Sequence, residues 1–224
     1  MLEIIATTLD DAVKICKGGA DRIELISALG EGGLTPSYGL IKSVVECARI
    51  PVNVIIRPHS RNFVYTDLEI QLMKEDIEVA KNLGANGVVI GVLNEFSQID
   101  TKKLEELLDV CEGLEVTFHR AIDYTNVASS VKILSQYQRI TSILTSGGIS
   151  NTVDKNIENI KKMIAYSKHI DILIGGGLNF DNFENLAIAT GAKSFHFGSA
   201  LRVNDAICEK KIAHLLKIKG EITI

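Results

Sequence analysis

The sequence contains no tryptophan, only three prolines, and four cysteines that never form a Cys-x-x-Cys pair. With so few prolines, no segment has the composition of a proline-rich linker. A chain of 224 residues can bury a full hydrophobic core without disulfides, so its scattered cysteines indicate reduced thiols. Basic residues are outnumbered by acidic ones, 24 to 28, and they form no cluster. This balance argues against nucleic acid or an anionic membrane as a partner.

Long apolar runs are also missing. No stretch approaches the roughly 20 apolar residues that a membrane-spanning helix needs. The first residues, MLEIIATTLDD, lack the basic start and the apolar length of a secretory signal peptide. Together with the reduced cysteines, these absences predict a cytoplasmic protein that does not bind membranes. Because no linker or low-complexity tract divides the chain, we expect a single domain over residues 1–224.

What the sequence does contain is a regular alternation of short β-branched segments with stretches of helical periodicity. Eight segments are expected to be strands: Leu2–Ala6, Arg22–Leu25, Val52–Ile56, Gly87–Ile90, Glu115–Phe118, Ile140–Thr145, Asp171–Ile174 and Ser194–Phe197. After the third of them, residues 67–83 are expected to form a helix with Asp67 as its N-cap. Eight strands that alternate with helices in a chain of this length predict a single (β/α)8 TIM barrel of the α/β class.

An open doubly wound sheet is the competing architecture. Its central strands are buried on both faces and are therefore apolar on both. Several segments here alternate instead, as Thr117 and His119 do with Val116 and Phe118. A closed barrel explains such alternation, because outward side chains pack on helices while inward ones meet in the lumen. We therefore favour the barrel and expect a polar lumen.

The polar residues on the inward faces fall into two groups by their height in the barrel. The group near the strand starts, at the barrel floor, comprises Glu3, Arg22, Asn53 and Glu115. The group near the strand ends, at the barrel mouth, comprises Glu24, Arg57, His119 and His196. Active sites of TIM-barrel enzymes lie at the strand ends, so we expect the mouth group to be functional and the floor group to form structural ion pairs.

Each residue of the mouth group has a chemical role open to it. Glu24 could act as a general base, and Arg57 could hold a carboxylate or phosphate through its planar guanidinium. His119 and His196 could move protons, or bind a metal ion through their imidazoles. Asp123 lies four residues after His119 and could orient it. These five residues form the predicted catalytic set.

Glycine-rich turns follow the sixth, seventh and eighth expected strands. In many TIM barrels the backbone N–H groups of these late loops bind a phosphate group, and glycine permits the close approach that such binding needs. Tight turns favour glycine for their own geometry as well, so both explanations remain open. The residues predicted to bind an anion are Arg57, Ser146, Gly147, Gly176, Gly177, Gly198 and Ser199.

The four cysteines, Cys16, Cys47, Cys111 and Cys208, fall on expected helices among apolar residues. Buried thiols of this kind behave as small hydrophobic side chains. A soft metal ion would need at least two thiolates that converge, and the helical spacing does not predict that. No lysine lies at the carboxyl end of an expected strand, so a Schiff-base mechanism is not expected either.

Five segments carry a family resemblance, in order and at matching spacing. They read GADRIELISALGEGGLTPSYGLI (19–41), PVNVIIRP (51–58), VTFHRAID (116–123), ILTSGG (143–148) and ILIGGG (172–177). These segments resemble the CutC family, which is named for copper homeostasis. The resemblance implies a TIM barrel, a cytoplasmic role in copper homeostasis and copper as a ligand. It also implies a polar mouth made of Glu24, Arg57, His119, Arg120 and Asp123, which adds Arg120 to the predicted anion-binding set.

Two features depart from the family pattern. Many members carry cysteines, connected with copper, at the ends of the first two strands, where this chain has Ile5 and Ile26. Cu(I) prefers thiolate or thioether ligands, so these replacements remove the expected soft site. The family's usual RPRGGDF reads RPHSRNF here (57–63), which changes the charge of the loop and removes its glycines.

Two functions from different classes follow. The resemblance implies a copper homeostasis protein that binds copper. The residues at the strand ends favour an enzyme that applies acid–base chemistry to a small anionic or phosphorylated metabolite. In either case the expected partner is a small anion or a metal ion. Barrels of this size often associate through an outer helix face, so we also expect a homo-oligomer.

Overall fold

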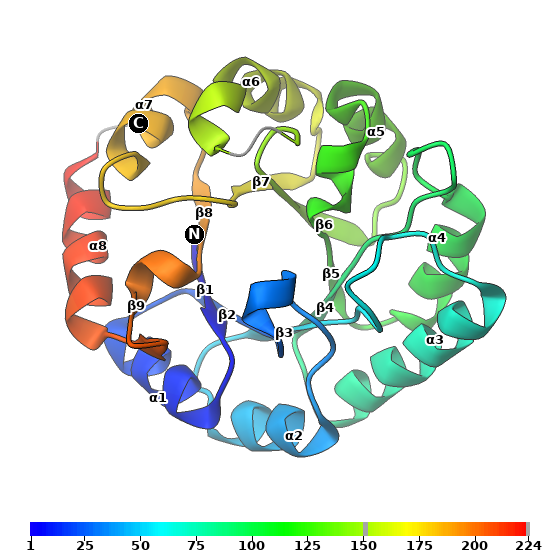
Figure 1. Cartoon of the computed structure of the whole chain (residues 1–224), viewed down its shortest axis with the longest axis horizontal. Coiled ribbons are helices and arrows are strands. Elements are labelled where there is room, and N and C mark those ends of the chain that lie inside the picture. Colours follow the sequence, from blue (N-terminus) through cyan, green and yellow to red (C-terminus); the bar gives the residue numbers. More distant parts are fainter. Residues whose placement is uncertain (150–151, 223–224) are drawn as a thin grey trace.

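Eight parallel strands close into a barrel in chain order, with β1 paired to both β2 and β8 (Figure 1). The structure is a computed structural model and describes residues 1–149 and 152–222. The strands are β1 Leu2–Ala6, β2 Arg22–Leu25, β3 Val52–Ile55, β4 Gly87–Ile90, β5 Glu115–Phe118, β6 Ile140–Thr145, β7 Asp171–Ile174 and β8 Ser194–Phe197. The predicted TIM barrel is confirmed, and only β3 ends one residue earlier than expected.

A ring of helices surrounds the barrel (Figure 1). They are α1 Leu9–Gly18, α2 Tyr38–Cys47, α3 Asp67–Asn82, α4 Thr101–Val110, α5 Val127–Leu134, α6 Ile157–Tyr166, α7 Phe183–Thr190 and α8 Glu209–Glu221. The prediction of Asp67 as a helix cap was wrong, because the N-cap of α3 is Thr66. Thr66 Oγ1 accepts from Glu69 N, and the Glu69 carboxylate accepts from Thr66 N, so this capping box satisfies two N–H groups at the start of the helix.

The outward faces of the strands pack on the helices and form the main core, in which residues such as Ile4, Ile23 and Val54 have no solvent exposure. The inward faces are mixed. They carry the expected polar residues, but Ile5, Ile26, Ile55 and Val89 form a separate buried group inside the barrel, which we call the lumen cluster. The expectation of a polar lumen therefore holds only in part, because the inward positions nearest the ends of β1 to β4 are aliphatic.

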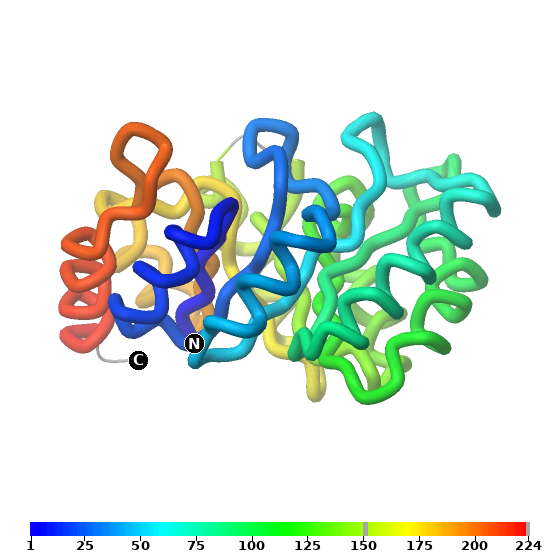
Figure 2. The backbone as a smooth tube through the Cα atoms, turned by 90° about the horizontal axis from the view of Figure 1, so that it is seen from below, coloured from blue at the N-terminus to red at the C-terminus, as the bar shows by residue number. Residues whose placement is uncertain are grey.

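The carboxyl ends of the strands carry the longer connections. Figure 2 shows the loop that contains the short helix η1 (Leu29–Glu31) and the hairpin of β9 (Arg202–Val203) and β10 (Ala206–Ile207) rising on the same side of the barrel. The N-terminus lies on the opposite side (Figure 2). In the part of the chain that the structure describes, no helix is long and apolar enough to cross a membrane.

All four cysteines are free, but they are less uniformly buried than predicted. Cys16 lies within α1, Cys47 is the last residue of α2, Cys111 follows α4 and Cys208 precedes α8. Only Cys111 is fully buried, and Cys47 is exposed. Two of the four thus cap helices rather than lie within them, Cys111 at the end of α4 and Cys208 at the start of α8.

Candidate functional site

A cavity of about 330 Å³ lies at the carboxyl ends of the strands. That volume is at the lower end of the range for small-molecule sites. Of the residues predicted from sequence to act at this mouth, those that line the cavity are Glu24, Arg57, His119, Arg120, Gly176, Gly177, His196, Gly198 and Ser199. Three others do not line it: Asp123, Ser146 and Gly147. The topology therefore brings most of the predicted residues to one hollow.

Beneath the cavity, a buried network begins at Glu3, whose side chain has no solvent exposure. Glu3 Oε2 accepts from Arg22 Nε at 2.6 Å, and Glu3 Oε1 lies 2.7 Å from His196 Nδ1. Arg22 Nη1 also donates to the partly exposed Glu115 at 3.3 Å. Burial alone would raise the pKa of Glu3, but the Arg22 charge and the His196 contact outweigh it, so the pKa is lowered and Glu3 is a carboxylate.

The predicted separation into a floor layer and a mouth layer was wrong at this point. Glu3, expected on the floor, is the register partner of both Arg22 and His196 in the sheet. The stagger of strands in a barrel sets these heights, and it places the middle of β1 level with the end of β8. Glu3, Arg22 and Glu115 of the floor group are consequently connected to His196 of the mouth group and, through it, to Glu24.

Glu24, on β2, is a buried carboxyl group at the cavity. It accepts no hydrogen bond from the residues that the structure describes, and its nearest ionic contact joins Oε2 to His196 Nε2 at 3.6 Å. Burial, together with the nearby Glu3 carboxylate, raises the pKa of Glu24 to about 7, although His196 and Arg22 oppose the shift. Burial disfavours charge on His196 as well, but Glu24 and Glu3 outweigh it, and the pKa of His196 is raised.

His119 follows β5 and serves as the N-cap of η2 (Arg120–Tyr124), where its Nδ1 accepts from Ala121 N at 3.1 Å. The proton of the neutral ring is therefore on Nε2, which is buried and has no partner among the described residues. Burial and the Arg57 charge lower the pKa of His119 to about 3. A Cβ atom at Gly91 would overlap this ring, so glycine there makes room for it.

Arg57 is more constrained than its predicted role requires. Its Nη1 donates to the carbonyls of Glu31 and Gly33, and its Nη2 donates to the carbonyl of Ser60. The Phe63 ring lies 4.8 Å from the guanidinium carbon. The planar fork is thus used to fix two loops at the rim. Only Nε, which is buried, lacks a partner among the described residues.

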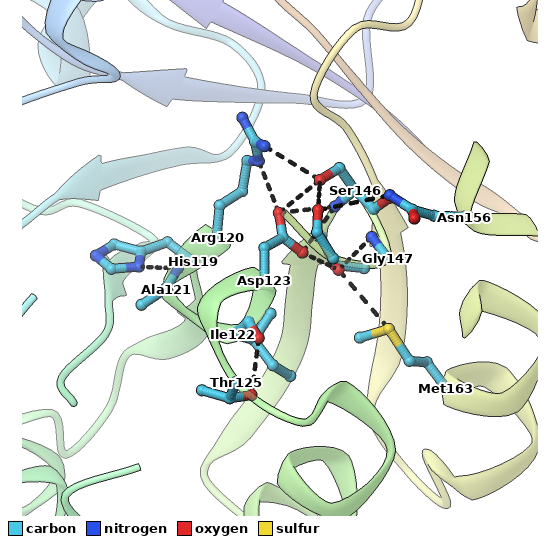
Figure 3. Close-up of polar contacts among 12 residues, drawn as sticks. His119, Arg120, Ala121, Ile122, Asp123, Thr125, Ser146, Gly147, Asn156 and Met163 are labelled. Atoms are coloured by element: carbon cyan, nitrogen blue, oxygen red, sulfur yellow. Dashed lines mark hydrogen bonds and ion pairs between the residues drawn. The ribbon is translucent and has the colours of Figure 1, made fainter. Parts of the chain in front are cut away.

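Asp123 is fully engaged behind the cavity wall (Figure 3). It accepts from Thr145 Oγ1 at 2.5 Å, from Ser146 Oγ at 2.7 Å, from Ser146 N and from Arg120 Nε. Gly147 N donates to Thr145 Oγ1. In Figure 3 the His119 ring lies apart from this group, and its Nδ1 partner is Ala121 rather than Asp123. Asp123 is therefore a structural anchor and not a partner of His119. The N–H groups of Ser146 and Gly147, which were predicted to bind an anion, already donate to Asp123 and Thr145.

Of the late glycines, Gly176, Gly177 and Gly198 line the cavity, and close packing explains two of them. A Cβ atom on Gly176 would lie 2.8 Å from Arg120 Cζ, and one on Gly198 would lie 2.8 Å from Ile5 Cδ1. The Arg120 side chain is about half exposed (47%) and donates to Asp123 and Ser146. Its guanidinium is therefore the cationic group best placed to meet an anion that enters the cavity.

The donor set for a metal ion differs from the predicted pair of histidines. Within the described residues, Glu3, Glu24 and His196 present ligand atoms that all lie within 4.8 Å of one another, and His119 is not part of this group. The cavity lining contains no cysteine or methionine in the described ranges, and it includes both Ile5 and Ile26. These residues do not fit Cu(I), which prefers sulfur ligands.

The sequence analysis placed Ile5 and Ile26 at strand ends but did not predict that the cavity has an apolar half. Ile5, Ile26 and Ile55 of the lumen cluster line it, and Phe63 packs on His119 with ring centroids 4.9 Å apart. The three isoleucines were detectable, because each stands two residues from a polar inward residue on its strand. Phe63 lies in an irregular loop, where no periodicity predicts its direction.

Comparisons with known proteins agree on one family. The CutC family model matches residues 1–201. A human protein named copper homeostasis protein cutC homolog is 39% identical over 200 residues, which cover 88% of this chain and 72% of that protein. A CutC family protein of Pasteurella multocida is 38% identical, with 91% and 84% covered. The crystal structure of CutC from Streptococcus agalactiae superposes with a TM-score of 0.84 at 35% identity, covering 90% of this chain and 99% of that one.

Proposed function

Because this chain belongs to the CutC family, we propose that it acts in the cytoplasm in copper homeostasis, the process for which its human relative is named. The observation that carries the proposal is the family match over residues 1–201, which includes every residue of the cavity. Since the cavity offers no sulfur ligand in the described residues, we further propose that the role does not depend on a thiolate Cu(I) site there.

A test in cells and a test in solution separate these two statements. Deletion of the gene should change the copper concentration that halts growth, and the wild-type gene should restore it. The purified protein should lose Cu(I) to a chelator of about micromolar affinity. The double variant Ile5→Cys/Ile26→Cys, with two thiols at the cavity, should retain it. Growth that is independent of the gene at every copper concentration would overturn the first statement, and tight Cu(I) binding by the wild type would overturn the second.

A second function is favoured by the buried Glu24 carboxyl, which accepts no hydrogen bond from the described residues and has a pKa of about 7. We propose an acid–base enzyme that acts on a small anionic or phosphorylated metabolite. Glu24 would accept or donate the proton, because a group with a pKa near the working pH does so best. The Nε2–H of the neutral His119 would donate to an oxygen atom on which negative charge develops. Arg120 and the turns at Gly177 and Ser199 would receive the anionic group.

The enzymatic proposal predicts that the cavity binds a small anion through Arg120. A panel of carboxylates and phosphate esters, tested by ligand-observed NMR, should contain a member that binds at millimolar concentration or below. Arg120→Met should weaken that binding about tenfold or more, because it removes a charge-assisted hydrogen bond. The matched control is Lys132→Met, which removes a cation that lies against Tyr166, outside the cavity. Equal weakening by both variants, or no binding anywhere in the panel, would contradict the proposal.

A further inference from the structure

Four ionisable side chains from three strands form an unbroken series of contacts that ends at the cavity. Arg22 Nε contacts Glu3 Oε2 at 2.6 Å, Glu3 Oε1 contacts His196 Nδ1 at 2.7 Å, and His196 Nε2 lies 3.6 Å from Glu24 Oε2. All four side chains are at least nine-tenths buried. Of the four, only His196 and Glu24 reach the cavity lining. The series therefore connects a fixed charge inside the barrel with a carboxyl group that a bound molecule can touch.

We propose that Glu3, His196 and Glu24 form a proton relay, in which Glu3 is the positioning residue and Glu24 exchanges a proton with the molecule in the cavity. The proposal rests on the enzymatic function proposed above and names the groups that would carry it out. Glu3 does not touch the cavity, so its contribution acts through the orientation and the charge of the His196 ring.

The contact with Glu3 decides which ring nitrogen of His196 is free to titrate. A carboxylate accepts, so Nδ1 carries a proton whenever it bonds to Glu3. Nε2 is then the position that gains or loses a proton, and it faces Glu24. A proton on Nε2 can pass to the Glu24 carboxylate and from there to a base in the cavity, and the reverse steps return it. The transfer moves one proton and needs no other reactant.

The surrounding charges favour this arrangement. Arg22 compensates the Glu3 carboxylate, with Glu115 as its second, partly exposed partner. The remaining charged groups at the cavity are Arg57, Arg120 and Glu31, and Arg120 lowers the pKa of His196 without reversing its upward shift. The pKa values of both His196 and Glu24 are raised, so their surroundings favour the protonated form of each group.

A divalent cation bound by Glu3, Glu24 and His196 is the alternative to a shared proton. Against it, Glu3 already binds Arg22 through one oxygen and His196 through the other, and His196 Nδ1 is occupied in turn. Only His196 Nε2 and the Glu24 carboxylate remain as ligands, whereas stable metal sites usually have three or more from the protein. The geometry thus favours a shared proton over a shared metal ion.

Nitrogen-15 NMR of the histidine side chains, without any substrate, tests the relay directly. In the wild type, His196 should carry its proton on Nδ1, titrate at Nε2, and have a pKa above 6.5. Glu24→Gln should lower that pKa by about one unit or more, because it removes the carboxylate charge that lies 3.6 Å from Nε2. Glu3→Gln should lower it too and should let the neutral ring populate the other tautomer. Glu115→Gln is the control, since it contacts the same Arg22 but not His196, and it should leave the tautomer and the pKa in place.

The outcomes are distinct. A His196 that titrates below 6.5, that is protonated on Nε2 when neutral, or that ignores Glu24→Gln would overturn the relay. If Glu3→Gln does not fold, Glu24→Gln carries the test alone. Stoichiometric ZnCl₂ that shifts the Nε2 resonance in the wild type but not in Glu24→Gln would overturn it in favour of a cation site. An intact NMR signature in a protein that binds no anion of the panel would refute the enzymatic function and leave the proton sharing established.

Discussion

Replacement of Asp123 by alanine should lower the free energy of unfolding by about 2–4 kcal/mol, because it leaves buried hydrogen-bond donors without their acceptor. The carboxylate accepts from two hydroxyls, one backbone N–H and one guanidinium, and its side chain is 1% exposed. Without it, the Ser146 N–H and the Thr145 hydroxyl lose their carboxylate acceptor, while Ser146 Oγ still has the Gly148 carbonyl at 2.9 Å. Urea denaturation followed by circular dichroism measures the change as a shift of the midpoint.

The control for this measurement is Asp181→Ala, since Asp181 is an exposed aspartate before α7. It should change stability by no more than about 0.5 kcal/mol. Asp123→Asn should fall between the two, because its amide oxygen can still accept while its NH₂ group faces donors. A loss below about 1 kcal/mol for Asp123→Ala would show that the network is dispensable, and the interpretation of Asp123 as a structural anchor would fail.

Acid should destabilise the protein through His119, and His119→Asn should remove that part of the loss. The folded protein keeps this ring neutral down to about pH 3, whereas the unfolded chain protonates it near pH 6.5. The unfolded state thus binds more protons in this window, so the stability present above pH 6.5 is lost as the pH falls. Between pH 7 and pH 4, the difference in unfolding free energy between variant and wild type should move by about 3 kcal/mol in favour of the variant.

Asparagine suits this test because it can accept the Ala121 N–H as an N-cap, as His119 does. Urea denaturation of both proteins at several pH values gives the difference directly, and other acid-sensitive groups cancel from it. His169→Asn, at an exposed histidine before β7, reports the effect of losing an imidazole elsewhere. A difference that stays constant from pH 7 to pH 4 would show that His119 titrates normally in the folded protein.

The strands were predictable because their signal is local. Each alternates or concentrates β-branched residues over four to six positions, and all eight ranges agree with the structure to within one residue. What the sequence leaves open is the stagger between strands, which is a property of the closed barrel. For that reason Glu3 could be assigned to an inward face but not to the level of His196.

The roles of individual polar residues were less accessible, because their partners lie far away in sequence or on the backbone. Arg57 is a cationic residue at a strand end, as an anion-binding residue would be. Its guanidinium, however, donates to three backbone carbonyls. Asp123 was expected beside His119 from its spacing of four residues, but η2 directs it to β6 instead. Residue type and strand position therefore predict where a site lies. Which of its residues can contact a ligand depends on their hydrogen-bond partners, and these are known only from the structure.

The pairing of β1 with β8 means that the barrel cannot close during synthesis until its last strand has been made. Glu3 and Arg22 are separated by 19 positions and can meet early, whereas Glu3 and His196 are separated by 193. A nascent chain therefore emerges from the ribosome with its first strand unpaired on one side until the last has been translated. Every partly made or truncated product that ends before β8 lacks the His196 imidazole, so the contact between His196 and Glu24 forms only when the ring of strands has closed.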